Sequence, residues 1–299
     1  MENWPNFLIV GAMRSGTSSL HQYLIQHKSI FMPKEVKEPA YFSRFPGSSP
    51  YDIKKPTKEE YLTLFNDVTD EKAIGEASVV YLRDPDSAKL IHDIIPDVKI
   101  IMILRDPVER AFSQYLGFLR MDPNFSISKA IRDDSENAKN DEFVVGTNRG
   151  SMGNPLIYGF YAKQLKRYLD LFDSNQIKVF IFEEFYNSPE TSLNEILNFL
   201  NIDEPFTSLK IEKHNDHYTP RKNLISVMKN PIIKKLGYSF LSENTRINLY
   251  KKLRAKDSKK PEMISTDVEY LTNYYRDEVS ELEKLLSKKL PWQSSAFKK

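Results

Sequence analysis

The chain has 299 residues, of which 40% are hydrophobic and 12% aromatic, so it can bury a core and is not generally disordered. Its 43 lysines and arginines nearly balance 41 acidic residues, and the net charge of +2 argues against a nucleic-acid partner. The absence of cysteine excludes disulfides, thiol catalysis and zinc sites with cysteine ligands.

The first apolar run of the chain covers residues 7–13 and ends at Arg14. It is too short to span a membrane, which takes about 20 residues. No basic stretch precedes the run, and it leads into a glycine turn rather than a cleavage site, so it does not have the pattern of a signal peptide. We interpret it as a buried strand and expect a soluble, cytoplasmic protein without stable membrane insertion.

Strands and helices alternate along the first two thirds of the chain. Short apolar runs without polar alternation, as in strands covered on both faces, predict strands at 7–11, 73–75, 98–104 and 177–182. Apolar residues at helical spacing predict helices at 17–27, 107–119, 159–171 and 189–200. This alternation predicts an α/β fold with a central parallel β-sheet flanked by helices.

The remaining segments differ in composition. Residues 121–156 are polar, and we expect mobile loops there around a short helix at 126–132. Lysine and arginine recur through 209–260 with few acidic residues, and an amphipathic helix is predicted at 266–289. We therefore predict one domain over residues 1–299, with its core at 5–205 and a basic, helical C-terminal subregion at 209–299.

A glycine-bounded loop joins the first predicted strand to the first predicted helix. Gly11 and Gly16 have the spacing of a phosphate-binding P-loop, but Thr17 stands where a nucleoside triphosphatase carries lysine. Backbone N–H groups and the helix dipole favour an anion at such a corner, unless it is only a strand–turn–helix connection with surface serines. With a cation inside the loop, the corner suits a 5′-phosphate with a charged group attached. The expected binding residues are Arg14, Ser15, Gly16, Thr17, Ser18 and Ser19.

A second strand–turn–helix corner follows at residues 98–119. Asp106 and Pro107 are typical of a helix start, and Arg105 falls at the carboxyl end of the strand, where open α/β sheets bind ligands. Arg105 and Ser113, two turns into the helix, could together bind a phosphate. Taken alone, the corner is also explained by a helix start with a structural ion pair.

The two corners together resemble the sulfotransferases that use 3′-phosphoadenosine 5′-phosphosulfate (PAPS). The resemblance is carried by R-S-G-T-S in the first corner and L-R-D-P-x-x-R-x-x-S-x-Y in the second. It implies the P-loop NTPase-like sulfotransferase fold, a first loop that holds the 5′-phosphosulfate, and binding of the 3′-phosphate by Arg105 and Ser113. Arg14 falls where many members carry the loop lysine. PAPS is then the donor, its product is adenosine 3′,5′-bisphosphate (PAP), and no metal is expected.

Later segments resemble glycan sulfotransferases of the heparan sulfate type. Residues 37–42 (K-E-P-A-Y-F) are similar to the segment with the catalytic glutamate, which implies that Glu38 is the base, with Arg14 as its catalytic partner. Residues 75–82 are similar to a second acceptor-side segment, although Ala77 replaces a frequent lysine. The resemblance places Lys37 and Glu76 beside the acceptor, and it places Tyr161, Arg221 and Lys222 at the cofactor. Without it, Glu38 would be an exposed carboxylate in a charged stretch.

The resemblance leaves alternatives for the acceptor and for its base. A carbohydrate hydroxyl is favoured as the acceptor, with a small metabolite or a lipid as alternatives. A histidine at 214 or 217 is a second candidate for the base. Two other functions remain open: a nucleotide-dependent kinase or NTPase, against which Thr17 argues, and an inactive module that only binds PAP.

Overall fold

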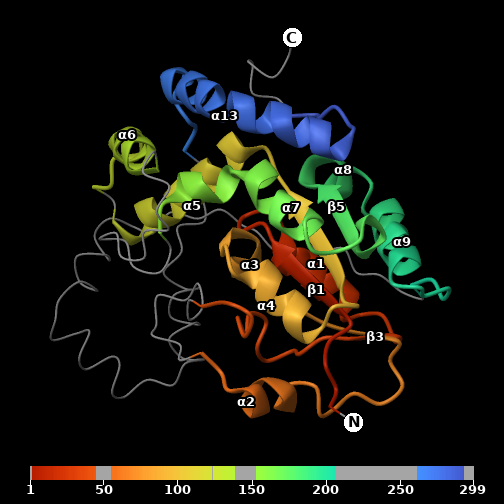
Figure 1. Cartoon of the computed structure of the whole chain (residues 1–299). Helices are drawn as coiled ribbons and strands as arrows, with labels where there is room; N and C mark the ends of the chain where they lie inside the picture. The colour runs from red at the N-terminus through yellow and green to blue at the C-terminus, as the bar shows by residue number, and fades with distance from the viewer. Residues whose placement is uncertain (1, 45–54, 123, 139–152, 207–260, 293–299) are drawn as a thin grey trace, which may run out of the picture.

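The computed structural model describes residues 2–44, 55–122, 124–138, 153–206 and 261–292 (Figure 1). These residues form a parallel sheet of five strands in the order β2-β3-β1-β4-β5. The strands are β1 (Phe7–Gly11), β2 (Ile30–Phe31), β3 (Ala73–Ala77), β4 (Lys99–Leu104) and β5 (Ile177–Ile181). The predicted α/β fold with a central parallel sheet is confirmed. The prediction missed β2, because two apolar residues do not form a recognisable run.

Helices cover both faces of the sheet, as the unbroken apolar strands predict. Phe7 and Ile9 of β1 are buried against one layer, and Leu8 and Val10 are buried against the other. The first layer contains α1 (Thr17–Leu24), α8 (Phe182–Asn187) and α9 (Pro189–Phe199). The second contains α3 (Val80–Arg83), α4 (Ser87–Ile94), α5 (Pro107–Met121), α7 (Tyr161–Leu169) and α13 (Ser265–Leu286).

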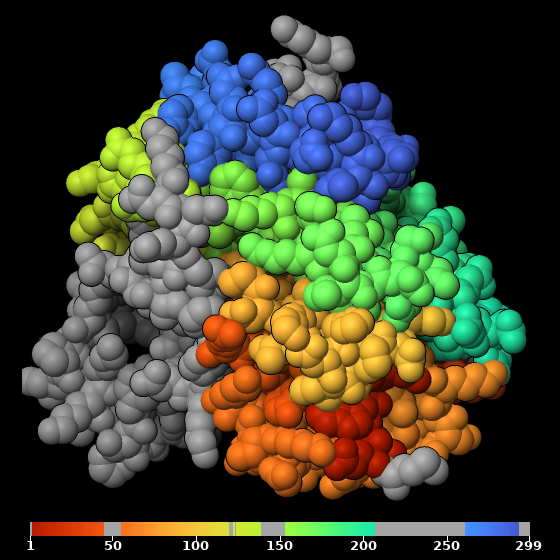
Figure 2. All heavy atoms as spheres, in the orientation of Figure 1, coloured from red at the N-terminus to blue at the C-terminus, as the bar shows by residue number. Residues whose placement is uncertain are grey.

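The C-terminal helix α13 lies farthest from the sheet, across α5 and α7 (Figure 1). Figure 2 shows it as an outer surface above α7. Its buried side chains include Leu271, Tyr275 and Leu282, which confirms the predicted amphipathic helix. The part of the chain that the structure describes contains no helix with both the length and the apolar character of a bilayer span. The bounds of the single predicted domain stay a prediction.

The smaller elements differ more from the predictions. The helix predicted at 126–132 extends over Ile127–Ala138 (α6), and the one predicted at 159–171 is divided between a 3₁₀ helix at Pro155–Gly159 (η2) and α7. Four α-helices have no predicted counterpart: α2 (Lys58–Thr63), α3, α4 and α8. A further 3₁₀ turn, η3, covers Ser174–Gln176.

The strand order determines where a ligand can bind. The chain leaves β1 toward β2 on one side of the sheet and leaves β4 toward β5 on the other. A crevice forms at such a reversal, beyond the carboxyl ends of the two neighbouring strands. Both predicted phosphate corners follow these strands, so the topology brings them to the same edge of the sheet.

Candidate functional site

The loop between β1 and α1 has a tightly specified backbone. Ala12 N–H donates to the carbonyl of Ile103 at 2.8 Å, which ties the loop to β4. Gly16 has a φ of +85°, and a Cβ there would lie 2.5 Å from the Tyr186 hydroxyl oxygen. The same hydroxyl donates to the Gly16 carbonyl at 2.8 Å. Glycine is therefore required at this position both for the backbone angle and for the close approach of Tyr186.

The loop presents donors that can meet an anion. The first N–H groups of α1, at Thr17 to Ser19, have no acceptor within the helix, and the cap residue is a glycine without a side chain. Ser15 Oγ is buried and makes no hydrogen bond within the described structure. The side chains of Arg14 and Ser18 are exposed. A loop with a glycine turn, unused N–H groups and a buried, unsatisfied hydroxyl fits a phosphate.

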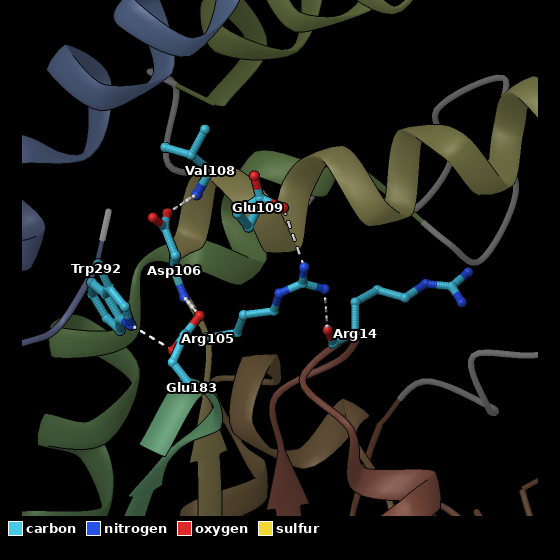
Figure 3. A network of polar contacts seen from close by, with 7 residues as sticks. All are labelled: Arg14, Arg105, Asp106, Val108, Glu109, Glu183 and Trp292. Atoms are coloured by element: carbon cyan, nitrogen blue, oxygen red, sulfur yellow. Dashed lines mark hydrogen bonds and ion pairs between the residues drawn. The ribbon is translucent and has the colours of Figure 1, made fainter. Parts of the chain in front are cut away.

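The second corner lies against the first, as Figure 3 shows. Arg105 Nη1 donates to the Arg14 carbonyl at 3.4 Å, and Nη2 lies 3.2 Å from Glu109 Oε2. The guanidinium carbon lies 4.9 Å from the centre of the Phe182 ring, and Arg105 Nε has no hydrogen-bond partner among the described residues. Asp106 caps α5 by accepting the Val108 N–H at 2.9 Å. The two corners thus form one cationic edge.

One face of α5 completes this edge. Glu109, Ser113 and Gly117 are spaced four residues apart and therefore lie on the same side of the helix. A Cβ on Gly117 would lie 3.2 Å from Arg14 Nη2, so the Arg14 side chain runs along this face. Figure 3 shows its guanidinium leading away from that of Arg105. Ser113, which is half-buried, occupies the helix position between Glu109 and Gly117.

Tyr161 has a different place from the one expected. The prediction put it at the cofactor, but its side chain is buried and its hydroxyl donates to the Arg105 carbonyl at 2.9 Å. Burial raises the pKa of this hydroxyl, which therefore stays protonated and able to donate. The ring of Tyr161 belongs to the core. Its hydroxyl therefore contacts the backbone of Arg105, a predicted phosphate-binding residue, from inside the protein.

The predicted acceptor side contains an ion pair. Lys37 Nζ lies 2.7 Å from Glu38 Oε1, and about a quarter of each side chain is exposed, 23% and 26%. Tyr158 of η2 is buried, and the charges of Glu38 and Arg14 both act on its hydroxyl. Burial is the larger influence and raises the pKa of Tyr158. Both predicted catalytic residues thus contribute to the electrostatic field at this tyrosine, where Arg83 and Arg110 act more strongly.

The structure contradicts the expectation that Glu76 contacts the acceptor, because its side chain is completely buried. It accepts hydrogen bonds from Ser78 Oγ at 2.8 Å and from the Tyr61 hydroxyl at 3.4 Å. Ser78 Oγ in turn accepts the Ala40 N–H at 3.0 Å. Tyrosine rings enclose the carboxyl group. Through Ser78 and the Ala40 N–H, Glu76 supports the segment that carries Glu38 from inside the protein.

Glu76 should make stability depend on pH. Burial raises its pKa from 4.5 to about 7, so the folded state binds this proton more tightly than the unfolded state. Stability is then expected to fall as the pH rises from about 4.5 to 7, by an amount on the order of 3 kcal/mol. In Glu76→Gln this contribution should vanish, so the variant should lose less stability than wild type between pH 4.5 and 8. Urea unfolding at several pH values checks this; equal pH dependence of both proteins would contradict it.

The remaining predicted residues include two that the structure does not place. Arg221 and Lys222, and the alternative bases His214 and His217, lie outside the described residues. Elsewhere, the described part of the chain contains no group of three histidine, aspartate or glutamate side chains that could hold a metal ion. His21 Nε2 lies 3.2 Å from the Pro33 carbonyl, and its ring is buried.

Sequence reasoning missed four residues of this region. They are Gly117, Glu183, Tyr186 and Trp292. A glycine inside a predicted amphipathic helix is a signal of close packing, and Gly117 could have been noticed for that reason. The other three act through contacts with residues that are distant in the sequence, so no local pattern indicates them.

A parallel sheet with two cationic corners at one edge defines an α/β protein built to bind an anionic ligand. The profile of the sulfotransferase domain matches residues 5–285. The chain belongs to this family, whose members are enzymes that transfer sulfuryl groups. The sulfotransferase fold expected from the two corner motifs is thereby confirmed.

Individual relatives agree with this. The crystal structure of a sulfotransferase from Alicyclobacillus acidocaldarius is 29% identical, with a TM-score of 0.70 over 99% of this chain and 100% of that one. A bifunctional heparan sulfate N-deacetylase/N-sulfotransferase 3 from Mus musculus is 25% identical over 94% of this chain. The chain spans only 30% of that relative's length. The membrane-associated sulfotransferase kil1 of Dictyostelium discoideum is 26% identical over 66% of this chain and 56% of its own.

Proposed function

We propose that this sulfotransferase moves the sulfuryl group of PAPS onto an acceptor hydroxyl, with a carbohydrate as the acceptor. The observation that carries the donor assignment is the hydrogen bond from Arg105 Nη1 to the Arg14 carbonyl. It joins two phosphate-suited corners into one site, as a nucleotide with phosphates at both its 3′ and 5′ positions requires. The glycine-bounded loop and the buried, unsatisfied Ser15 hydroxyl fit the 5′-phosphosulfate.

Each residue has a distinct task in this proposal. Residues 14–19 hold the 5′-phosphosulfate, Arg105 and Ser113 hold the 3′-phosphate, and Arg221 and Lys222 contribute to binding of the nucleotide. Glu38 accepts the proton of the acceptor hydroxyl as its oxygen attacks the sulfur in line. The bond between sulfur and the bridging oxygen breaks, and Arg14 stabilises the charge that develops on the departing phosphate. Lys37 orients Glu38 through their ion pair.

The acceptor class rests on the relatives and on the segment at 37–42. The mouse relative is named for heparan sulfate, which supports a carbohydrate acceptor. Its name also specifies N-sulfotransfer, so amino sugars belong in an acceptor panel beside neutral glycans, glycolipids and small alcohols. A cytoplasmic location stays a prediction from the sequence.

Ligand-induced stabilisation tests the donor. We expect PAP and PAPS to raise the melting temperature, and ATP and GTP to leave it unchanged with or without Mg²⁺. Transfer of label from PAPS to the acceptor panel then tests catalysis. A response to ATP or GTP alone would indicate a nucleotide-dependent kinase or NTPase. Binding of PAP without transfer to any acceptor would indicate an inactive binding module.

Arg105→Ala should specifically weaken binding of the 3′-phosphate. Loss of a charge-assisted contact costs about 1.5–3 kcal/mol, so the Kd of PAP should rise roughly 10- to 150-fold. Adenosine 5′-monophosphate (AMP), which lacks the 3′-phosphate, should bind almost unchanged. Calorimetry with both ligands measures this, and Arg276→Ala on the exposed face of α13 serves as a control. Equal weakening of both ligands would contradict the assignment.

A further inference from the structure

We infer that Glu183 and Trp292 are positioning residues for the donor's 3′-phosphate, because they fix the backbone from which Arg105 extends. The inference rests on the proposed function, in which Arg105 binds that phosphate. Neither residue touches the expected position of the ligand. Both belong to the far side of the second corner, where α8 and the segment after α13 meet (Figure 3).

The peptide unit between Arg105 and Asp106 is held at both of its polar atoms. The Tyr161 hydroxyl donates to its carbonyl oxygen at 2.9 Å, and its N–H donates to Glu183 Oε1 at 3.1 Å. A peptide unit is planar, so two hydrogen bonds in opposite directions fix its rotation. The direction in which the Arg105 side chain leaves the backbone is thereby restricted.

Trp292 supports both of these contacts. Its Nε1–H donates to the other oxygen of the same carboxyl group, Glu183 Oε2, at 3.1 Å. Its ring centre lies 6.1 Å from that of Tyr161, and only 2% of its surface is exposed. The two carboxylate oxygens thus accept N–H groups from residues 106 and 292. Without the indole donor, one oxygen of the half-buried Glu183 carboxylate would lose this partner, at a cost that favours rearrangement of the side chain.

The helix α8 also supports the guanidinium itself. Phe182, the residue before Glu183, places its ring under the Arg105 guanidinium at 4.9 Å. A shift of Glu183 would therefore move the aromatic support and the backbone contact together. A long arginine side chain gains affinity for a phosphate when its orientation is set before binding, because less conformational entropy is then lost. The structure contains this prearrangement through four side chains around Arg105: Tyr161, Phe182, Glu183 and Trp292.

The test uses Trp292→Phe, which removes the N–H donor and keeps an aromatic ring in the core. Calorimetry on the full chain should show PAP binding weakened on the order of tenfold, with AMP binding changed less than about twofold. Trp4→Phe is the matched control, since Trp4 Nε1 donates to Glu2 Oε2 at the same distance, 3.1 Å, in an exposed pair. It should leave both affinities unchanged.

A second variant separates positioning from folding. Glu183→Gln keeps the size of the side chain but replaces one of the two accepting oxygens with an NH2 donor, so it cannot keep both contacts in their present geometry. It should lower the PAP-to-AMP preference like Trp292→Phe, and the double variant should lose less than the product of the two single effects. An unchanged preference in both single variants, or equal weakening of both nucleotides, overturns the inference. If Arg105→Ala also leaves the preference unchanged, the proposed function itself fails.

Discussion

Replacing Glu38 with glutamine is expected to lower kcat at least about 100-fold while the Kd of PAP stays unchanged. Glutamine preserves the size of the side chain and its capacity for hydrogen bonds, but it cannot take up the proton of the acceptor hydroxyl. The neighbouring Lys37 would keep an oxygen partner, so the local structure should survive. Steady-state kinetics with a good acceptor, together with PAP calorimetry, measures both quantities.

The pH–rate profile gives the same prediction a second readout. A carboxylate base must be ionised, so the acidic limb of the wild-type profile should disappear in Glu38→Gln. Glu35→Gln is the matched control, because Glu35 lies in the same charged segment and is exposed. Near-normal turnover of Glu38→Gln, combined with loss of activity in His214→Ala or His217→Ala, would assign the base to histidine.

Arg14→Ala is expected to reduce kcat by about 100- to 1,000-fold, the range found when a stabiliser of transition-state charge is removed. The Kd of PAP should change far less, because the Arg14 carbonyl and not its side chain joins the two corners. The guanidinium lies instead beside Gly117 and, with Glu38, influences the hydroxyl of Tyr158.

Arg14→Lys serves as the conservative comparison. It restores the positive charge without the planar geometry, so we expect partial recovery of kcat. Turnover and donor affinity must be measured separately, since a role in donor binding would give the opposite pattern: a large rise in Kd with little change in kcat. That pattern would remove Arg14 from the chemical step.

The sequence was sufficient for four of the five strands and for the two corners. Runs such as residues 100–104 are apolar throughout, and a strand followed by glycine or by Asp-Pro has a strong local signature. The parallel topology then brings both corners to one edge, although they are about 90 residues apart. To predict where a phosphate would bind, only local patterns were needed, together with the rule that ligands bind at the carboxyl ends of parallel strands.

The same reasoning did not predict that the side chains of Glu76 and Tyr161 are buried, because burial is decided by distant residues. Glu76 looks like an acceptor contact in its own segment, but Tyr61 encloses it from α2. Tyr161 is directed into the core by its helix and contacts a carbonyl 56 residues away in sequence. The contact between Glu183 and Trp292 spans 109 residues, so no spacing in the sequence could indicate it.

The bond between Arg105 and the Arg14 carbonyl has a consequence for which nucleotides the protein can distinguish. In the proposed function, it fixes the separation between the 3′- and 5′-phosphate positions on opposite sides of a single ribose. A nucleotide with charge at both positions then fits both corners, whereas a linear triphosphate extends its charge from one side only. Selection between them then follows from spacing within the protein and requires no contact to the base.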